Sequence, residues 1–102
     1  MRVEWSLPAA DDLADLDRYI SRDSAHYAHA FIERILFATR RLGEFPESGR
    51  LVPEDDSRQT REFIVQGYRV MYSIEPDHVL ILAVMHGSRD LTNPGNQPWD
   101  TH

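Results

Sequence analysis

The pattern of apolar and polar residues in the first part of the chain predicts a short strand followed by a helix. Residues 2–6 alternate polar and apolar, which is typical of a strand with Val3 and Trp5 on one face. Ser6 is then a suitable helix N-cap, and Pro8 is tolerated in the first turn. The next apolar residues recur at spacings of four, three and four and share one stripe: Ala9, Leu13, Leu16 and Ile20.

A second amphipathic helix is predicted to begin at Ala25, with Asp23 or Ser24 as its N-cap. Its apolar stripe continues for about four turns: Ala28, Phe31, Ile32, Ile35, Leu36, Thr39 and Leu42. Gly43 follows where a left-handed C-terminal cap is expected. The polar side of the first helix is expected to face water: Asp12, Asp15, Arg18 and Arg22. The two helices therefore form a hairpin whose apolar stripes need a common partner.

The second half of the chain predicts a small sheet. Residues 44–59 are rich in Pro, Gly, Ser and acidic residues, so they are expected to form a loop. One short extended piece is expected within that loop, at 50–52. Three strands follow, separated by Gly67 and by a Pro-Asp turn: 61–66, 68–75 and 78–86.

These elements predict an α+β fold in the order β-α-α-β-β-β, with an antiparallel helical hairpin packed on one face of a small, mainly antiparallel sheet. A chain of 102 residues has room for one core. We expect a single domain over residues 1–90. Residues 91–102 contain two prolines, a glycine and no hydrophobic period, so an irregular or disordered tail is expected.

Composition narrows the possible functions. The net charge is −6, and all eleven basic residues are arginine. Because nucleic-acid binding depends on neutralising phosphates, this charge argues against direct nucleic-acid binding. No apolar run approaches the roughly 20 residues of a membrane helix, so no membrane association is expected. The lack of cysteine and of a secretory signal pattern favours a cytoplasmic protein.

Three motifs in a fixed order carry a family resemblance. They are FPxxGR at 45–50, RE-x4-GYR-x2-Y at 61–72 and HG-x-RD at 86–90. Together with the preceding helices, they make residues 3–90 resemble the RelE/ParE toxin superfamily of type II toxin–antitoxin systems. The sequence is most similar to the ParE and plasmid-stabilisation branch.

This resemblance implies a growth-arresting toxin that forms a hetero-oligomer with a cognate antitoxin. ParE-like members poison DNA gyrase, which is the interpretation we favour. RelE-like members are metal-independent endoribonucleases that cut mRNA on the ribosome, and this is the alternative. A third possibility is a degenerate module that binds its antitoxin without toxicity. We expect no cofactor and no metal, because His26 and His29 lack a third ligand at matching spacing.

For the ribonuclease alternative, the resemblance implies three catalytic residues. Arg69 would contact phosphate, His86 would act as acid or base, and Glu62 lies nearby. Strand alternation places Arg69 and Tyr72 on opposite faces unless the strand bulges. The missing lysine, the acidic charge and the absence of a basic or aromatic C-terminal helix argue against catalysis.

The same residues can instead serve target binding or the framework of the fold. This set comprises Arg50, Arg61, Arg69, His86 and Arg89. As framework residues, Arg69 would pair with Glu62 or Glu75 on the solvent side of the sheet, His86 would bond a loop carbonyl, and Arg89 would pair with Asp90. An Arg-carboxylate bond at Arg50 would hold its turn. The expected antitoxin-binding residues lie on the helical stripes: Leu13, Leu16, Ile20 and Phe31.

Overall fold

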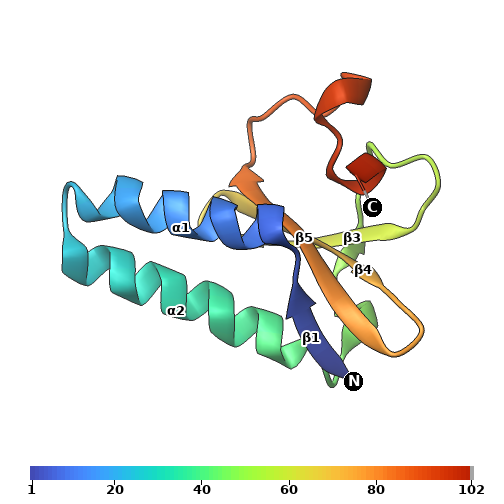
Figure 1. Ribbon diagram of the computed structural model, residues 1–102, viewed down its shortest axis with the longest axis horizontal. Helices are drawn as coiled ribbons and strands as arrows, with labels where there is room; N and C mark the ends of the chain where they lie inside the picture. Colours follow the sequence, from blue (N-terminus) through green and yellow to red (C-terminus); the bar gives the residue numbers. More distant parts are fainter. Residues whose placement is uncertain (102) are drawn as a thin grey trace.

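A computed structural model, which describes residues 1–101, confirms the predicted α+β fold. Two helices lie side by side and antiparallel, and the strands form one sheet beside them (Figure 1). The elements are β1 (Arg2–Trp5), α1 (Leu7–Ser21), α2 (Ala25–Arg41), β2 (Arg50–Leu51), β3 (Thr60–Val65), β4 (Tyr68–Ile74) and β5 (His78–His86). Short 3-10 turns are formed by Pro46–Ser48, Pro94–Asn96 and Pro98–Thr101. In residues 1–101, none of the helices has the length and apolar character to cross a membrane.

The sheet has the order β1-β5-β4-β3-β2. Strands β3, β4 and β5 form the predicted antiparallel meander. The first strand pairs with the last one in parallel, with Val3 opposite Val79. This pairing joins segments about 76 residues apart, so no local pattern in the sequence could indicate it.

The predicted helix starts are confirmed, and α2 ends just before Gly43 as predicted, but the left-handed cap expected at Gly43 is wrong. The Ser6 hydroxyl accepts the Ala9 N–H at 3.1 Å, and the Ser24 hydroxyl accepts the Tyr27 N–H at 3.0 Å. Gly43 is not left-handed, because Gly67 is the only glycine with positive φ among the described residues. Gly43 is required for space instead: a Cβ there would lie 2.6 Å from the carbonyl oxygen of Met1.

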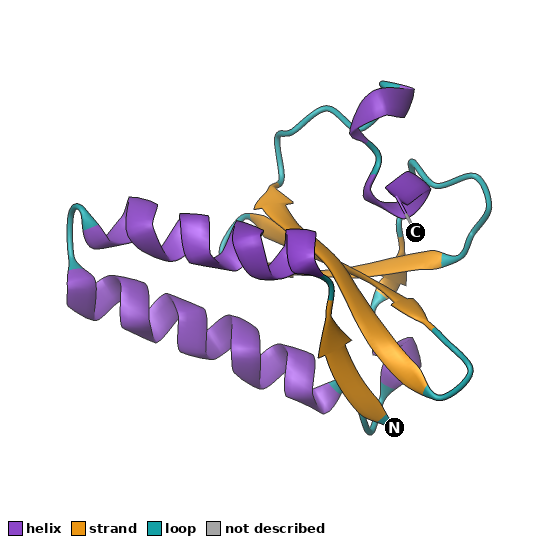
Figure 2. Ribbon diagram, viewed as in Figure 1, coloured by secondary structure: helices purple, strands orange, loops and turns teal. Residues whose placement is uncertain are grey.

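Each face of the sheet has its own hydrophobic cluster. The helices cover one face (Figure 2) with a core built from Ala9, Leu16, Phe31, Ile35, Leu42, Val70, Tyr72, Val79, Ile81 and Val84. The second face carries a smaller cluster of Val52, Met71, Ala83, Met85 and Leu91, against which Trp99 packs. Leu91 is only 1% exposed, so the segment after β5 folds back onto this face instead of leaving it. Covering three apolar strand residues explains why the segment is held there.

Strand β5 contains a bulge, and beyond it a backbone N–H of β5 bonds to a side chain of α1. Met71 pairs with Ala83 but Tyr72 pairs with Ile81, so Leu82 is an extra residue. Beyond β1, the Val84 N–H on this edge donates to the Asp12 carboxylate of α1 at 3.0 Å. The prediction that Asp12 faces water is therefore wrong, because its side chain is half-buried between helix and sheet.

Candidate functional site

Arg69 lies in a buried ionic cluster on the second face of the sheet. Its Nε donates to Glu62 Oε1 at 2.6 Å, and its two terminal nitrogens donate to the two oxygens of Glu54, each at 2.8 Å. Arg50 Nε donates to the remaining oxygen of Glu62 at 2.8 Å. Two arginines and two glutamates thus form a cluster whose formal charges cancel.

The central pair of this cluster is buried, whereas the Arg50 side chain is largely exposed. The side chain of Glu62 is 0% exposed and that of Arg69 is 7% exposed. Hydrogen bonds from Arg69 are the main cause that lowers the pKa of Glu54. The same bonds raise the pKa of Arg69, with burial acting in the opposite direction. Each arginine of the cluster therefore lies against a glutamate, and each glutamate against an arginine.

The hairpin between β3 and β4 positions the central pair. Glu62 lies opposite Met71 and Arg69 lies opposite Ile64, so the two charged side chains are diagonal neighbours on one face. Gln66 and Gly67 have φ of 47° and 85°, as a two-residue hairpin turn requires. Register and turn chemistry together fix this contact.

Part of the expected framework role of Arg69 differs in the structure. The pair with Glu62 is present, but it is buried instead of lying on the solvent side. Glu75 accepts from the Ser73 hydroxyl and does not reach Arg69. Glu54 takes that place from the loop after β2. Its only sequence signal is the acidic VPED stretch of the loop, which does not by itself show that the loop folds back over the sheet.

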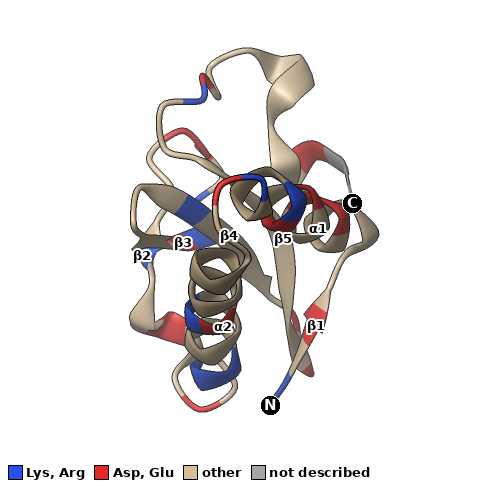
Figure 3. Cartoon of the chain, turned by 90° about the vertical axis from the view of Figure 1, so that its left-hand side faces the viewer, with Lys and Arg blue, Asp and Glu red and all other residues tan. Residues whose placement is uncertain are grey.

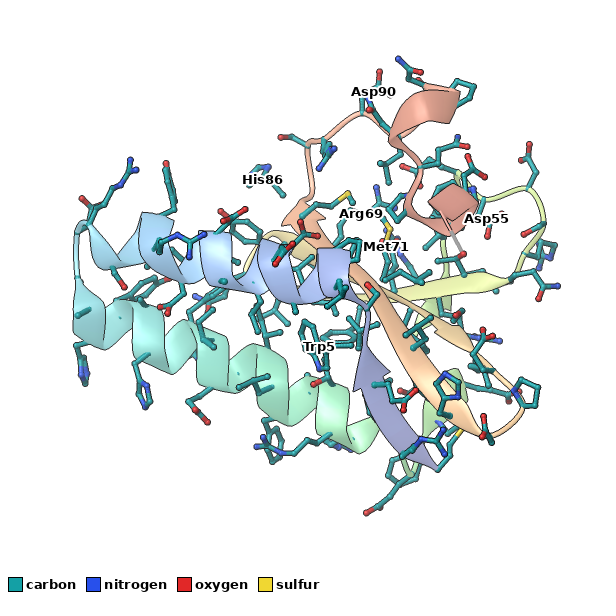
Figure 4. All side chains as sticks on the ribbon, in the orientation of Figure 1. Trp5, Asp55, Arg69, Met71, His86 and Asp90 are labelled. Carbon is teal, nitrogen blue, oxygen red and sulfur yellow. The ribbon has the colours of Figure 1, made fainter. Side chains whose placement is uncertain are left out.

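His86 lies on the other face of the sheet from Arg69. The register pairs His86 with Tyr68 and Arg69 with Met85, and successive residues of a strand point to opposite faces. The His86 ring packs edge-on against Tyr68 with centroids 5.3 Å apart. Its Nδ1 accepts the Ser88 N–H at 3.1 Å, so its bonding partner is Ser88, not the expected carbonyl. Figure 4 shows His86 and Arg69 on different sides of β5.

Of the three residues implied for a ribonuclease, the structure brings together only Glu62 and Arg69. Both are engaged in ion pairs. His86 is exposed and turned away from them. In this arrangement Arg69 cannot hold a phosphate while His86 transfers a proton to or from the same phosphate group.

Arg61 and Tyr72 hold the FPESGR loop against the sheet. Arg61 Nη1 donates to the Gly49 carbonyl at 2.7 Å. The Tyr72 hydroxyl accepts the Gly49 N–H at 2.9 Å and donates to the Pro46 carbonyl at 2.7 Å. A Cβ at Gly49 would lie 2.6 Å from the Tyr72 oxygen, so only glycine fits. Burial raises the pKa of Tyr72.

The predicted placement of Tyr72 and Arg69 on opposite faces of the sheet is confirmed. Tyr72 belongs to the helix-side core, whereas Arg69 lies in the ionic cluster of the second face.

Arg89 is exposed and lies outside the ionic cluster. Asp90 accepts from the N–H and hydroxyl of Thr92 at 2.9 and 2.6 Å, and no ion pair links it to Arg89 within residues 1–101. Arg89 acts instead on Asp12: burial raises the pKa of Asp12, and the positive charge of Arg89 offsets part of that increase. The five candidate residues therefore do not form one site.

An apolar groove lies along the helical hairpin and β1. It has a volume of about 340 Å³ and is lined by Trp5, Ala10, Leu13, Ala14, Asp17, Ile32 and Leu36. Of the residues expected to bind an antitoxin, only Leu13 lines this groove. Leu16 and Phe31 are buried in the core, and Ile20 packs against that core. The sequence pattern predicts only that Trp5, Ile32 and Leu36 are apolar residues of a strand and a helix, and it does not predict that they line a groove. A hydrophobic stripe does not reveal which of its residues remain accessible.

Figure 3 shows basic and acidic residues interspersed along the chain, on helices, strands and loops. The basic side chains of Arg50 and Arg69 are neutralised by glutamates, as described above. Arg61 donates to the backbone carbonyls of Glu47 and Gly49. Three of the four motif arginines, Arg50, Arg61 and Arg69, are thus committed to contacts within the protein.

Comparison with known proteins identifies the family. The family model described as "ParE toxin of type II toxin-antitoxin system, parDE" matches residues 3–91. "Putative toxin Y4kP" of Sinorhizobium fredii (strain NBRC 101917 / NGR234) is 36% identical over 87 residues, covering 83% of this chain and 86% of that protein.

Solved structures show the same fold. A chain of the chromosomal ParDE TA system from P. aeruginosa has a TM-score of 0.70 at 18% identity, covering 84% of this chain and 95% of that one. A chain of the toxin-antitoxin complex RelBE2 from Mycobacterium tuberculosis has a TM-score of 0.58 at 25% identity, covering 83% and 95%. With the family model and the relative agreeing over most of its length, the chain belongs to the ParE toxin family of type II toxin–antitoxin systems.

Proposed function

We propose that this toxin arrests growth by binding and poisoning DNA gyrase, and that a cognate antitoxin neutralises it by occupying the groove of the helical hairpin. The observation that carries the first part is the separation of Arg69 and His86 onto opposite faces of the sheet. It favours action by binding over RNA cleavage. Membership of the ParE family supports gyrase as the target, and this proposal includes a cytoplasmic location for the toxin.

The chemistry of RNA cleavage explains why this separation matters. A ribonuclease that works without metal needs a base, an acid and a cation around one phosphate. Arg69 already gives one hydrogen bond to Glu62 and two to Glu54. A phosphate would have to displace a bidentate carboxylate from a buried position, which costs far more than a contact at an exposed arginine.

The antitoxin part of the proposal rests on the apolar groove. Its walls are mainly Trp5, Leu13, Ile32 and Leu36. A groove of this kind suits the apolar face of an amphipathic helix. The two structural neighbours are described as a ParDE toxin–antitoxin system and a RelBE2 complex, which supports a protein partner of this class.

Pulse labelling of DNA and protein synthesis tests the target. Labelling starts in the first minutes after the toxin is induced without its antitoxin. Early loss of DNA synthesis with intact translation is the expected result. Early loss of translation would favour the ribonuclease alternative, and an unaffected culture containing soluble folded protein would favour a module that only binds its antitoxin.

Substitution of His86 adds a residue-level test of the same point. His86→Gln removes the proton-transfer group at an exposed position. Toxicity should persist, because a binding mechanism does not use the imidazole as acid or base. Loss of toxicity in a folded variant that still binds purified gyrase would contradict the proposal.

The antitoxin site is tested by blocking the groove. Ala14 is exposed and lines it, so Ala14→Arg places a long charged side chain in the groove without removing core residues. Affinity for the antitoxin should fall at least about tenfold, equivalent to roughly 1.4 kcal/mol. Ala30→Arg is the matched control, because Ala30 is exposed on α2 and does not line the groove. Equal effects of both variants would place the antitoxin elsewhere.

A further inference from the structure

We propose that a second site, on the opposite side of the protein from the groove, binds an arginine side chain from a basic segment of a partner protein. The site is a cavity between the loop after β2, the end of β4 and the C-terminal turn Pro98–Thr101. Its volume is about 530 Å³. It is independent of the groove, because none of its lining residues belongs to α1, α2 or β1.

The cavity carries a concentrated negative charge. Within residues 1–101 no basic side chain lines it, whereas five carboxylates do: Glu54, Asp55, Asp56, Glu75 and Asp100. Glu54 is neutralised by Arg69. Among residues 1–101, no ion pair involves the other four. A cation entering this cavity would therefore meet charges that the protein itself leaves uncompensated.

Asp55 is the buried member of this group. It is only 4% exposed, and its Oδ1 accepts from the Ser57 N–H and hydroxyl at 3.0 and 2.6 Å. Its Oδ2 is buried without a hydrogen-bond partner. Burial acts to raise the pKa of Asp55, but polar groups of Ser57 and Thr60 outweigh it and lower that pKa. The carboxylate is thus ionised at neutral pH and has unused acceptor capacity beneath the cavity, an arrangement that native proteins rarely leave without a purpose.

The remaining walls favour an arginine side chain over a metal ion. Within the described residues, no group of three or more His, Asp or Glu side chains is arranged to hold a metal. Trp99 and Ile74 also line the cavity. An indole attracts a guanidinium through its π face, and an aliphatic residue accommodates the methylene stem. The planar fork of a guanidinium can bond several separated carboxylate oxygens at once.

The side chains in Figure 4 place Asp55 beside the C-terminal turn, away from both helices. Trp99 joins this turn to the hydrophobic cluster of the second face. The same contact that holds the turn on the sheet therefore also forms a wall of the cavity. A protein with net charge −6 attracts basic partners in general, and this cavity gives that attraction a specific location.

Titration with a short peptide tests the site. The probe is a blocked peptide, Gly-Arg-Gly-Arg-Gly, and its twin carries neutral citrulline in place of both arginines. The signal is the indole N–H of Trp99 in a nitrogen–proton NMR spectrum, with Trp5 in the groove as internal reference. We expect a saturable shift of the Trp99 signal with the arginine peptide and none with the citrulline peptide. A missing shift, or equal shifts with both peptides, would overturn the proposal.

Charge removal then separates a site from general attraction. Asp56→Asn combined with Glu75→Gln should weaken peptide binding about tenfold, since one exposed ion pair is worth about two- to fivefold. Asp11→Asn combined with Asp23→Asn removes the same charge from exposed positions on the helix side and should change binding less than about twofold. An equal loss in both double variants would mean non-specific electrostatics and refute the site.

Discussion

Arg69 of β4 and His86 of β5 lie on adjacent strands and on opposite faces of the sheet. The register places Arg69 opposite Met85 and His86 opposite Tyr68. Arg69 is buried between two glutamates, while His86 is exposed at the end of its strand. Substitutions at the two positions should therefore have different consequences, one for stability and the other for the surface alone.

Arg69→Ala should destabilise the protein by about 3–5 kcal/mol, because it leaves Glu62 buried beside only one remaining cation. Urea unfolding followed by circular dichroism measures this loss. His86→Gln is the control and should change the free energy of unfolding by less than about 0.5 kcal/mol. If Arg69→Ala unfolds within about 1 kcal/mol of the wild type, the cluster does not stabilise the fold as argued.

A double variant checks the cause of that loss. Arg69→Met with Glu62→Met removes both buried charges and replaces them with apolar side chains. Replacing a whole buried pair is often neutral, whereas breaking it is not. The double variant should accordingly be more stable than Arg69→Ala, although Glu54 and Arg50 lose their partners. A double variant less stable than Arg69→Ala would point to a packing effect.

Local signals predicted most of the fold. The alternation of residues, the caps Ser6 and Ser24 and the turn at Gly67 each depend on a few neighbouring residues, and the structure confirms them. The parallel pairing of β1 with β5 depends on segments that meet only after folding. The same is true of the fold-back of Leu91 onto the second face, for which the sequence offers only one apolar residue in a polar segment.

The candidate site was harder to predict than the fold for a related reason. Motif residues such as Arg69 and Tyr72 could be assigned to opposite faces from alternation alone. Their partners could not, because Glu54 and Gly49 come from the long loop between α2 and β3. A loop without a hydrophobic period carries no signal for where it folds back.

The pH dependence of stability should report the Arg69–Glu54 pair. Arg69 lowers the pKa of Glu54 below the unfolded value of about 4.3. A carboxylate of this kind stabilises the fold above its unfolded pKa, and that stabilisation is lost as pH falls through the lower, folded pKa. Glu54→Gln should therefore be less stable than wild type at pH 7, and the difference should shrink below about pH 4.

Urea unfolding of wild type and Glu54→Gln at several pH values from about 2.5 to about 7 measures this difference in stability, which should shrink below about pH 4. Glu33→Gln is the matched control, because Glu33 is exposed on α2 and forms no ion pair with residues 1–101. Its stability should follow that of the wild type across the range. Parallel curves for Glu54→Gln and wild type would contradict the lowered pKa.

Tyr72→Phe should loosen the FPESGR loop. The change removes the hydroxyl that bonds the Gly49 N–H and the Pro46 carbonyl, and leaves both groups without that partner. The expected loss of stability is about 1–3 kcal/mol, the cost of unsatisfied buried polar groups. Hydrogen exchange at the Gly49 amide should accelerate together with this loss. Tyr19→Phe, at an exposed position of α1, should change neither quantity.

Asp12→Asn should stabilise the protein at neutral pH, in the opposite sense to Glu54→Gln. Burial raises the pKa of Asp12, and the bond from the Val84 N–H and the charge of Arg89 only partly offset this. A raised carboxyl pKa means that the ionised form is disfavoured in the folded state. The stability contributed by Asp12 is thus full below its unfolded pKa of about 3.9 and is lost as pH rises through the folded pKa.

Asparagine imitates the neutral acid and keeps an oxygen to accept the Val84 N–H. The gain from Asp12→Asn should hence be absent near about pH 3.5 and grow as pH rises above about 4. Asp11→Asn, at the exposed neighbouring position, controls for the change in net charge and for the helix dipole. A gain that is equal in both variants would assign the effect to general repulsion in an acidic protein, whereas a gain confined to Asp12 would assign it to the carboxylate between α1 and β5.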